Sequence, residues 1–318
     1  MHILITGGAG FIGSNLIKHL LQQNPEARIT CIDNFDPFYS PDLKYQRIRE
    51  FEPFANFRML ELDLAENNAN LLALAVEQPV DIIVHLAAKA GVRPSIENPE
   101  AYVKANVLAL QHLLDFARIK NVPQFVFASS SSVYGINPDL PWTEEQKLQP
   151  ISPYAMTKLS GEMMGHVYHS LYSFRFIALR FFTVYGPGQR PDLAINQFTD
   201  KMMNGNPINI YGDGTTSRDY TYVEDIVRGI EAAMYYDRSG FEIINLGNHD
   251  TVSLKDLIST IEEITGKKAI INHLPEQPGD VPHTYADISK AKRLLNYTPG
   301  TSIKDGIRKY YEWKKREA

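Results

Sequence analysis

The chain has 318 residues, of which 44% are hydrophobic and 22% are charged, and its formal net charge is −5. This is an ordinary globular composition, so collagen, coiled-coil, repeat and disordered classes are excluded. The mildly acidic balance, without a dense Lys/Arg block, argues against nucleic acid as the main partner. No apolar run reaches the roughly 18 residues that span a bilayer, so no membrane association is expected.

Short apolar, β-rich runs alternate with helical stretches over about the first 180 residues. Such alternation predicts a parallel sheet covered on both faces, and continuous apolar runs fit strands buried on both sides. We therefore predict an α/β fold with a Rossmann-type doubly wound parallel sheet. The predicted strands are 2–6, 28–33, 57–62, 80–86, 124–129 and 175–181, and the predicted helices are 11–23, 66–78, 98–119 and 152–172.

The amino-acid composition changes after residue 180. Residues 186–221 are rich in Gly, Pro, Asn and Asp, and helical segments recur near 222–236, 253–265 and 302–315. We predict a nucleotide-binding domain over 1–180, whose sheet later segments can complete, and a smaller α/β substrate region over 181–318. No low-complexity linker separates them, so the boundary is soft. The ligand cleft is expected between them, at the carboxyl ends of the strands.

A glycine-rich turn, GGAGFIG, follows the first predicted strand and opens the first helix. Gly7, Gly10 and Gly13 follow a G-x-x-G-x-x-G spacing, slightly different from the G-x-G-x-x-G dinucleotide pattern. Gly7 permits the tight turn, Gly10 lets the backbone approach a pyrophosphate, and Gly13 lets the helix pack closely. The helix N-terminus then offers free N–H groups to phosphates. The alternative is a purely structural turn.

Two acidic residues end neighbouring strands on the same side. Asp33 lies 20 residues beyond Gly13, where a carboxylate accepts bonds from a ribose diol and repels a 2′-phosphate, so NAD is favoured over NADP. Asp63, just after the third strand, is placed to accept a bond from the adenine amine. The alternative for both is an ordinary loop carboxylate.

Tyr154 and Lys158 are four residues apart at a predicted helix start, so their side chains share one face. A phenol has a pKa near 10, and a neighbouring ammonium favours the phenolate, which makes Tyr154 a workable general acid/base. The strand at 124–129 delivers four serines, Ser129 to Ser132, to the same edge of the sheet. Ordinary helix residues and a polar turn are the alternatives.

No metal site is predicted. The nine histidines are scattered, and His166 and His169 are the only near pair, spaced i, i+3 without a carboxylate or Cys partner close in sequence. We interpret them as packing or surface residues. The single cysteine, Cys31, excludes an intrachain disulfide, and the N-terminus lacks a basic signal-peptide region, so a cytoplasmic location is expected.

The chain resembles, nearly end to end, the extended short-chain dehydrogenase/reductases that act on nucleotide sugars. The motifs that carry the resemblance are GGAGFIG, IDNFDPFY, HLAAKAGVR, SSSSVYG, SPYAMTK, LRFFTVYGPGQRPD, YGDGTTSRDYTYVEDI and QPGDVPHTYADISKA. Within this family it is most similar to UDP-glucuronate 4-epimerases, through HLAAKAGVRPSIENP, RFFTVYGPGQRPD and QPGDVPHTYAD.

The resemblance implies a set of roles. Tyr154 is the base, Lys158 its electrostatic partner and ribose contact, and Ser130 the catalytic hydroxyl. The implied NAD contacts are Gly7, Gly10, Phe11, Ile12, Gly13, Asp33, Asn34, Asp63, Leu64, Ala87, Ala88, Lys89 and Asn106, together with Tyr154 and Lys158. The implied UDP-sugar contacts are Arg93, Ser130, Ser131, Ser132, Thr183, Arg190, Arg218 and Asp280, with Arg218 favoured for the diphosphate.

The implied reaction is NAD-dependent 4-epimerisation through a transient 4-keto sugar. For glucuronate this intermediate is a β-keto acid that loses CO₂ readily, and we expect Ser131, Ser132 and Thr183 to hold its carboxylate away from the reactive alignment. A neutral-sugar 4-epimerase commonly has Asn at Thr183 and Arg at Gln277. A UDP-glucuronate decarboxylase, a 4,6-dehydratase and a non-catalytic NAD-binding protein are further alternatives. In similar enzymes the helices at 98–119 and 152–172 form a dimer bundle, so a homodimer is expected.

Overall fold

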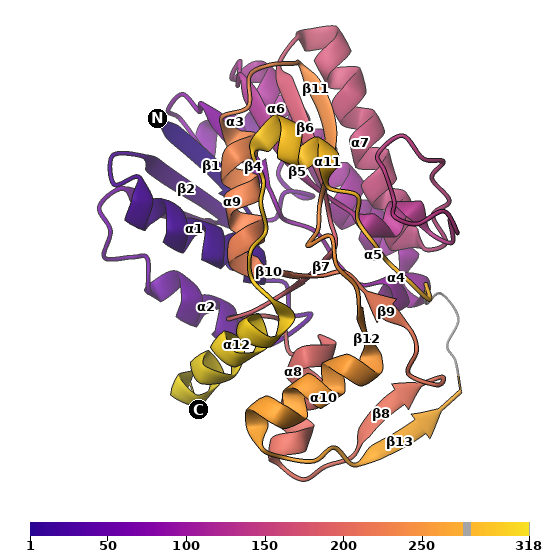
Figure 1. The fold of residues 1–318 in the computed structure, drawn as a ribbon. Helices are drawn as coiled ribbons and strands as arrows, with labels where there is room; N and C mark the ends of the chain where they lie inside the picture. Colours follow the sequence, from indigo (N-terminus) through magenta and orange to yellow (C-terminus); the bar gives the residue numbers. More distant parts are fainter. Residues whose placement is uncertain (276–280, 318) are drawn as a thin grey trace.

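A computed structural model describes residues 1–275 and 281–317. Its centre is a sheet of seven parallel strands in the order β11-β6-β5-β4-β1-β2-β3 (Figure 1). The order reverses direction beside β1, which is the doubly wound topology that the strand–helix alternation predicted. The strands are β1 (His2–Thr6), β2 (Arg28–Asp33), β3 (Phe57–Glu61), β4 (Ile82–His85), β5 (Gln124–Ser130), β6 (Arg175–Phe181) and β11 (Phe241–Leu246).

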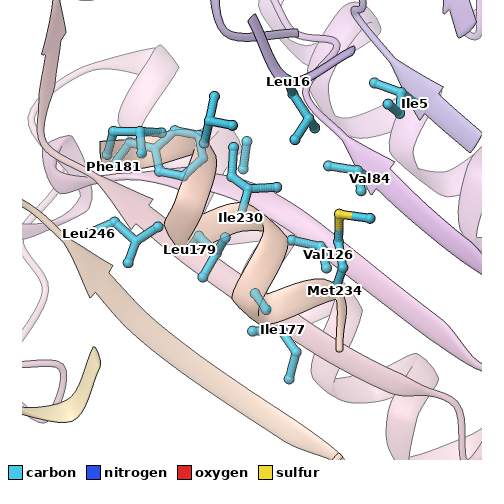
Figure 2. Packing of buried hydrophobic residues seen from close by; sticks show 14 of the residues in the cluster. Ile5, Leu16, Val84, Val126, Ile177, Leu179, Phe181, Ile230, Met234 and Leu246 are labelled. Atoms are coloured by element: carbon cyan, nitrogen blue, oxygen red, sulfur yellow. The ribbon is translucent and has the colours of Figure 1, made fainter. Parts of the chain in front are cut away.

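Helices cover both faces of this sheet. One face packs against α1 (Phe11–Gln23), α9 (Val223–Met234) and α11 (Ser289–Leu295), and the other against α3 (Ala69–Ala75), α6 (Ala109–Ile119) and α7 (Pro153–Tyr172). Figure 2 shows the first face, where Ile230 and Met234 of α9 reach Val126 and Leu179 of the strands. Burying each such side chain contributes about 1.5–3 kcal/mol, so both faces are held by apolar packing.

The C-terminal part lies beyond the carboxyl ends of the strands, in the lower half of Figure 1. It has its own apolar core, which includes Ile195, Ile208, Leu257 and Ile307. Its elements are α8 (Ala194–Met203), α10 (Leu254–Thr265) and α12 (Ile303–Glu317), and the strand pairs are β7 (Thr183–Tyr185) with β10 (Tyr220–Tyr222), β8 (Ile208–Tyr211) with β13 (Ile271–Leu274), and β9 (Ser217–Arg218) with β12 (Val252–Ser253).

Strand β11 joins the sheet beside β6, so a segment beyond residue 180 completes it, as the prediction allowed. Other elements differ from the expectation. Helices α2 (Pro41–Arg49) and α4 (Val92–Glu97) were not predicted, and the predicted helix at 98–119 consists of α5 (Pro99–Val103), the π-helical turn η1 (Lys104–Leu108) and α6. No helix of the described residues is long and apolar enough to cross a membrane.

Candidate active site

A cavity of about 530 Å³ opens at the carboxyl ends of the central strands, where the sequence predicted the cleft. It is bounded by the glycine turn after β1, the loops after β2 to β6, and the start of α7. The predicted site residues that line it are Gly7, Gly10, Phe11, Ile12, Gly13, Asp33, Asn34, Asp63, Leu64, Ala87, Ala88, Lys89, Ser130, Ser131, Ser132, Tyr154, Lys158, Thr183 and Arg190.

The glycine turn forms one end of the cavity. Gly7 has φ +74°, in the left-handed region, and a Cβ there would lie 2.6 Å from the Ala87 nitrogen. A Cβ on Gly13 would lie 2.3 Å from the carbonyl oxygen of Gly7, so only glycine lets α1 begin this close to the turn. Gly10 is the N-cap of α1, and no side chain caps the helix. The first N–H groups of α1 are thus available to an anion.

Asp33 lies beside this turn and is 8% exposed. Its two carboxylate oxygens accept N–H bonds from Ala9 (3.0 Å) and Phe35 (2.9 Å), which fix the side chain at the end of β2. Burial raises the pKa of the Asp33 carboxyl, against these bonds and the nearby charge of Lys44. Each oxygen keeps a further lone pair for a ligand hydroxyl.

The next loops continue the wall. Asn34 donates to the Asp63 carboxylate (2.9 Å), so these two predicted residues are in direct contact. Lys89 pairs with Asp36, with 2.7 Å between Nζ and Oδ2. Asn106 does not line the cavity. Its side-chain oxygen accepts the Lys89 N–H (2.8 Å) and its side-chain amide donates to the Lys89 carbonyl (3.0 Å), so it fixes the backbone of that loop.

Helix α7 brings Tyr154 and Lys158 to the other end of the cavity. The helix is capped by Ser152, which accepts the Ala155 N–H at 3.1 Å. Lys158 is buried, and its Nζ donates to the Ala128 carbonyl of β5 at 2.7 Å. The Ser130 hydroxyl accepts bonds from the Ser132 N–H (3.2 Å) and hydroxyl (2.9 Å), and a further hydrogen bond joins it to the Tyr154 phenol.

The electrostatics differ in one respect from the expectation. Burial raises the pKa of Tyr154, while the hydrogen bond from Ser130 and the charge of Arg190 lower it. Burial also lowers the pKa of Lys158 to about 7, so this amine is only partly protonated near neutral pH. The nearby charge that lowers the pKa of Tyr154 is that of Arg190, which comes from a loop far away in sequence.

The three predicted arginines are not all on the cavity wall. Arg190 lines the cavity and forms two bonds to Asp192, at 2.9 and 2.7 Å. Arg93 stacks on the Tyr211 ring, 4.9 Å from its centre, and does not line the cavity. Arg218 also lies outside the wall, where it donates to the carbonyls of Ser217 (2.9 Å) and Pro282 (3.1 Å). Asp280 and Gln277 lie outside the described residues.

Sequence reasoning missed a buried network behind the serines. Glu162 accepts bonds from Arg180 and from Ser129, and Arg180 also donates to the Tyr134 hydroxyl. One signal was present: Glu162 follows Lys158 by four residues, on the face of α7 that carries Tyr154. Its partner Arg180 interrupts the apolar sequence of β6, RFIALRF, but nothing in the spacing indicated which carboxylate it pairs with.

No group of three His, Cys, Asp or Glu side chains in the described part of the chain is placed to hold a metal ion. The pair considered from the sequence packs instead: the rings of His166 and His169 lie 4.9 and 6.3 Å from that of Phe241. His166 is exposed and His169 is half-buried, so the pair lies at the surface beside Phe241.

Comparisons with known proteins agree with this geometry. The family model described as GDP-mannose 4,6 dehydratase matches residues 4–310. The chain belongs to this family of NAD-dependent epimerases and dehydratases within the extended short-chain dehydrogenase/reductases.

Several of the similar proteins carry epimerase names. UDP-glucuronate 4-epimerase of Thermodesulfobacterium geofontis is 40% identical, covering 99% of this chain and 96% of its own length. The crystal structure of UDP-glucuronic acid 4-epimerase from Bacillus cereus, in complex with UDP-glucuronic acid and NAD, is 39% identical with a TM-score of 0.93 and full coverage of both chains. An uncharacterised UDP-glucose epimerase of Bacillus subtilis is 42% identical, covering 96% of each chain. Relatives at this distance thus carry more than one sugar name.

Proposed function

We propose that the protein is a UDP-glucuronate 4-epimerase that interconverts UDP-glucuronate and UDP-galacturonate with NAD as a bound cofactor. The observation that carries the proposal is the single cavity that joins a dinucleotide-type glycine turn to Ser130, Tyr154 and Lys158. The same cavity carries hydroxyl side chains at the positions expected to face the sugar.

The cavity wall fits NAD. The uncapped N-terminus of α1 and the glycines suit a pyrophosphate, and the Asp33 carboxylate suits a ribose diol. Lys158 and the backbone of Ala87 and Ala88 are proposed to contact the half nearer the reacting sugar. When bound, NAD supplies a reversible hydride acceptor.

Tyr154 is proposed to take the proton of the sugar 4-hydroxyl as the C4 hydrogen leaves as hydride, which gives a 4-keto sugar. The hydride returns to the opposite face of C4, and Tyr154 gives its proton back to the oxygen, so atoms and electrons balance over the cycle. Ser130 donates to the phenol and supports its ionised form, and Arg190 adds a positive charge nearby. Such a positioned acid/base group contributes about 100- to 10,000-fold.

The carboxylate of the substrate requires separate control. The 4-keto form of glucuronate is a β-keto acid, which loses CO₂ when its C5–C6 bond aligns with the ketone π system. We propose that Ser131, Ser132 and Thr183, which all line the cavity, hold the carboxylate out of this alignment. Hydroxyls fix its orientation without adding a charge.

Product analysis tests the proposal. Purified protein with UDP-glucuronate is expected to form UDP-galacturonate of unchanged mass, and alanine at Ser131 or Thr183 to increase CO₂ release or weaken the preference for glucuronate. Unchanged partition and preference in both variants would refute the carboxylate assignment. Conversion of UDP-glucose or UDP-N-acetylglucosamine only, or release of CO₂ by wild type, would assign the neutral-sugar epimerase or the decarboxylase, respectively. No turnover with NAD bound would assign the binding protein.

Dehydration is disfavoured by the cavity wall. A 4,6-dehydratase resembling this chain carries an Asp-Glu pair after the catalytic hydroxyl, where Ser131 and Ser132 stand here. Among the described residues, the acidic side chains that line the cavity are Asp33, at the end of β2, and Asp36 and Asp63, on the loops after β2 and β3. Among the described residues, the loop after β5 thus adds no carboxylic acid to the cavity wall to drive elimination of a C6 hydroxyl.

We further propose a homodimer through α7. One side of this helix leaves apolar side chains exposed, with Met163 and Leu171 each 65% exposed, and neighbouring α5 and η1 add more. A contiguous apolar stripe on adjacent helices fits a four-helix contact with a second copy. The exposed members are Met156, Met163, Val167 and Leu171 of α7, with Val103 and Leu108 beside them.

A further inference from the structure

Three consecutive residues of β5 contact one face of α7. The backbone carbonyl of Ala128 accepts the Lys158 ammonium at 2.7 Å. The Ser129 hydroxyl donates to Glu162 Oε1 at 2.5 Å, and Ser130 bonds the phenol. The three side chains of α7 are spaced four residues apart: Tyr154, Lys158 and Glu162. The strand that presents the hydroxyl is therefore joined to the helix that presents the phenol at three points.

The contact between Glu162 and Ser129 is fixed by a buried ion pair. Arg180 forms two parallel bonds with Glu162, Nε to Oε1 at 2.9 Å and Nη2 to Oε2 at 2.8 Å. The two side chains are 1% and 3% exposed. Arg180 lies directly opposite Ser129 in the register of β5 and β6, and its Nη1 donates to the Tyr134 hydroxyl at 2.9 Å. A carboxylate held by a bidentate pair in a dry site has one orientation, so the oxygen offered to Ser129 is fixed.

Apolar packing alone does not explain these charges. A buried ion pair is weak evidence for stability, because apolar residues of similar volume often serve as well. What Glu162 provides, and an apolar residue would not, is an acceptor for Ser129. Since Ser129 precedes Ser130 by one residue, holding Ser129 against α7 limits how far Ser130 can move from the phenol.

We propose that Glu162 and Arg180 are positioning residues for the reaction: Arg180 orients Glu162, Glu162 holds Ser129, and Ser129 thereby sets the hydrogen bond between Ser130 and Tyr154. This inference rests on the proposed role of Tyr154 as acid/base. Neither Glu162 nor Arg180 lines the cavity, so both act through other residues.

The test is a double-mutant cycle with Ser129→Ala, Ser130→Ala and the combined variant. The matched control is Thr199→Val, which removes a buried hydroxyl that donates to Ile195 at 2.7 Å within α8, away from the cavity. For each variant, kcat, KM, the pH dependence of kcat/KM and the melting temperature are measured. An ultraviolet difference titration against Tyr154→Phe, in the absence of substrate, follows the ionisation of this one phenol.

Ser129→Ala is expected to lower kcat about tenfold, a fraction of what a positioned acid/base group contributes, with KM nearly unchanged. Because the Ser130 bond favours the phenolate, the acid limb of the pH profile and the phenol titration should both move to higher pH. In the Ser130→Ala background, Ser129→Ala should add little, since the two residues act in series. Thr199→Val should lower only the melting temperature.

Two results would overturn the positioning role of Glu162 and Arg180. One is a Ser129→Ala variant that behaves like Thr199→Val, and the other is additive effects of the two serine substitutions. If wild type does not turn over UDP-glucuronate, the proposed function fails. The phenol titration without substrate still decides whether Glu162 and Arg180 position Ser130. As a second check on Glu162 itself, Glu162→Gln keeps an acceptor for Ser129 but loses the ion pair. Its phenol titration should move in the same direction, by less than that of Ser129→Ala, and no movement would contradict the role of Arg180.

Discussion

Gly13→Ala is the substitution whose effect can be worked out most fully from the geometry. The new Cβ would lie 2.3 Å from the Gly7 carbonyl oxygen and 2.7 Å from the Gly8 Cα. Both atoms belong to the backbone, so the turn must move by about 1 Å to reach ordinary contact distances. Overpacking of this kind costs about 1–3 kcal/mol, and the better helix propensity of alanine returns less than about 1 kcal/mol.

The expected result is a net loss of about 1–2 kcal/mol in the free energy of unfolding, with at least tenfold weaker NAD binding because the α1 N-terminus moves with the turn. Urea denaturation and calorimetric titration with NAD measure the two effects. Gly300→Ala is the control, since nothing lies within 4 Å of its added Cβ and both quantities should stay at the wild-type value. A Gly13→Ala protein with unaltered stability and NAD affinity would refute the reasoning.

Two further predictions concern the network and the dimer. Arg180→Met leaves the buried Glu162 carboxylate without its ion-pair partner and should lower the free energy of unfolding by about 3–5 kcal/mol in urea denaturation. Adding Glu162→Leu should recover most of this loss. No recovery would show that the ion pair stabilises the fold. Met163→Glu with Leu171→Glu should convert the proposed dimer to monomers in light scattering, while Leu74→Glu on α3, where the side chain is slightly more exposed, should not. Wild-type protein that is already monomeric would contradict the proposed contact.

The central sheet could be predicted from the sequence because its signals are local. Each buried parallel strand is an apolar run, and the glycine turn and Asp33 are at fixed spacings from it. Strand β11 shows the limit of this reasoning, since only the three-dimensional structure reveals that Phe241–Leu246 pairs with β6. Helix α2 was missed because most of its nine residues are polar and few apolar positions mark a buried face.

In the site, too, residues at local spacings could be predicted, and residues placed by long-range contacts could not. Tyr154 and Lys158 are recognisable because four residues on a helix bring them to one face, as the structure has them. Arg47 carries no such signal. It donates to the carbonyls of Ala9 (3.1 Å) and Gly188 (2.7 Å), and so joins the glycine turn to the loop that carries Arg190. Such contacts between segments distant in sequence place the charge of Arg190 near the phenol, and no spacing along the chain indicates them.

The most direct test of the account compares Tyr154→Phe with wild type, each supplied with NAD and UDP-glucuronate. Tyr102→Phe is the matched control, because its ring is centred 6.3 Å from that of Tyr154 while its hydroxyl donates to the Ala90 carbonyl. We predict that Tyr154→Phe forms UDP-galacturonate about 100- to 10,000-fold more slowly than wild type, and that Tyr102→Phe loses far less. Formation of UDP-galacturonate by Tyr154→Phe at the wild-type rate would contradict the central claim that this phenol moves the proton.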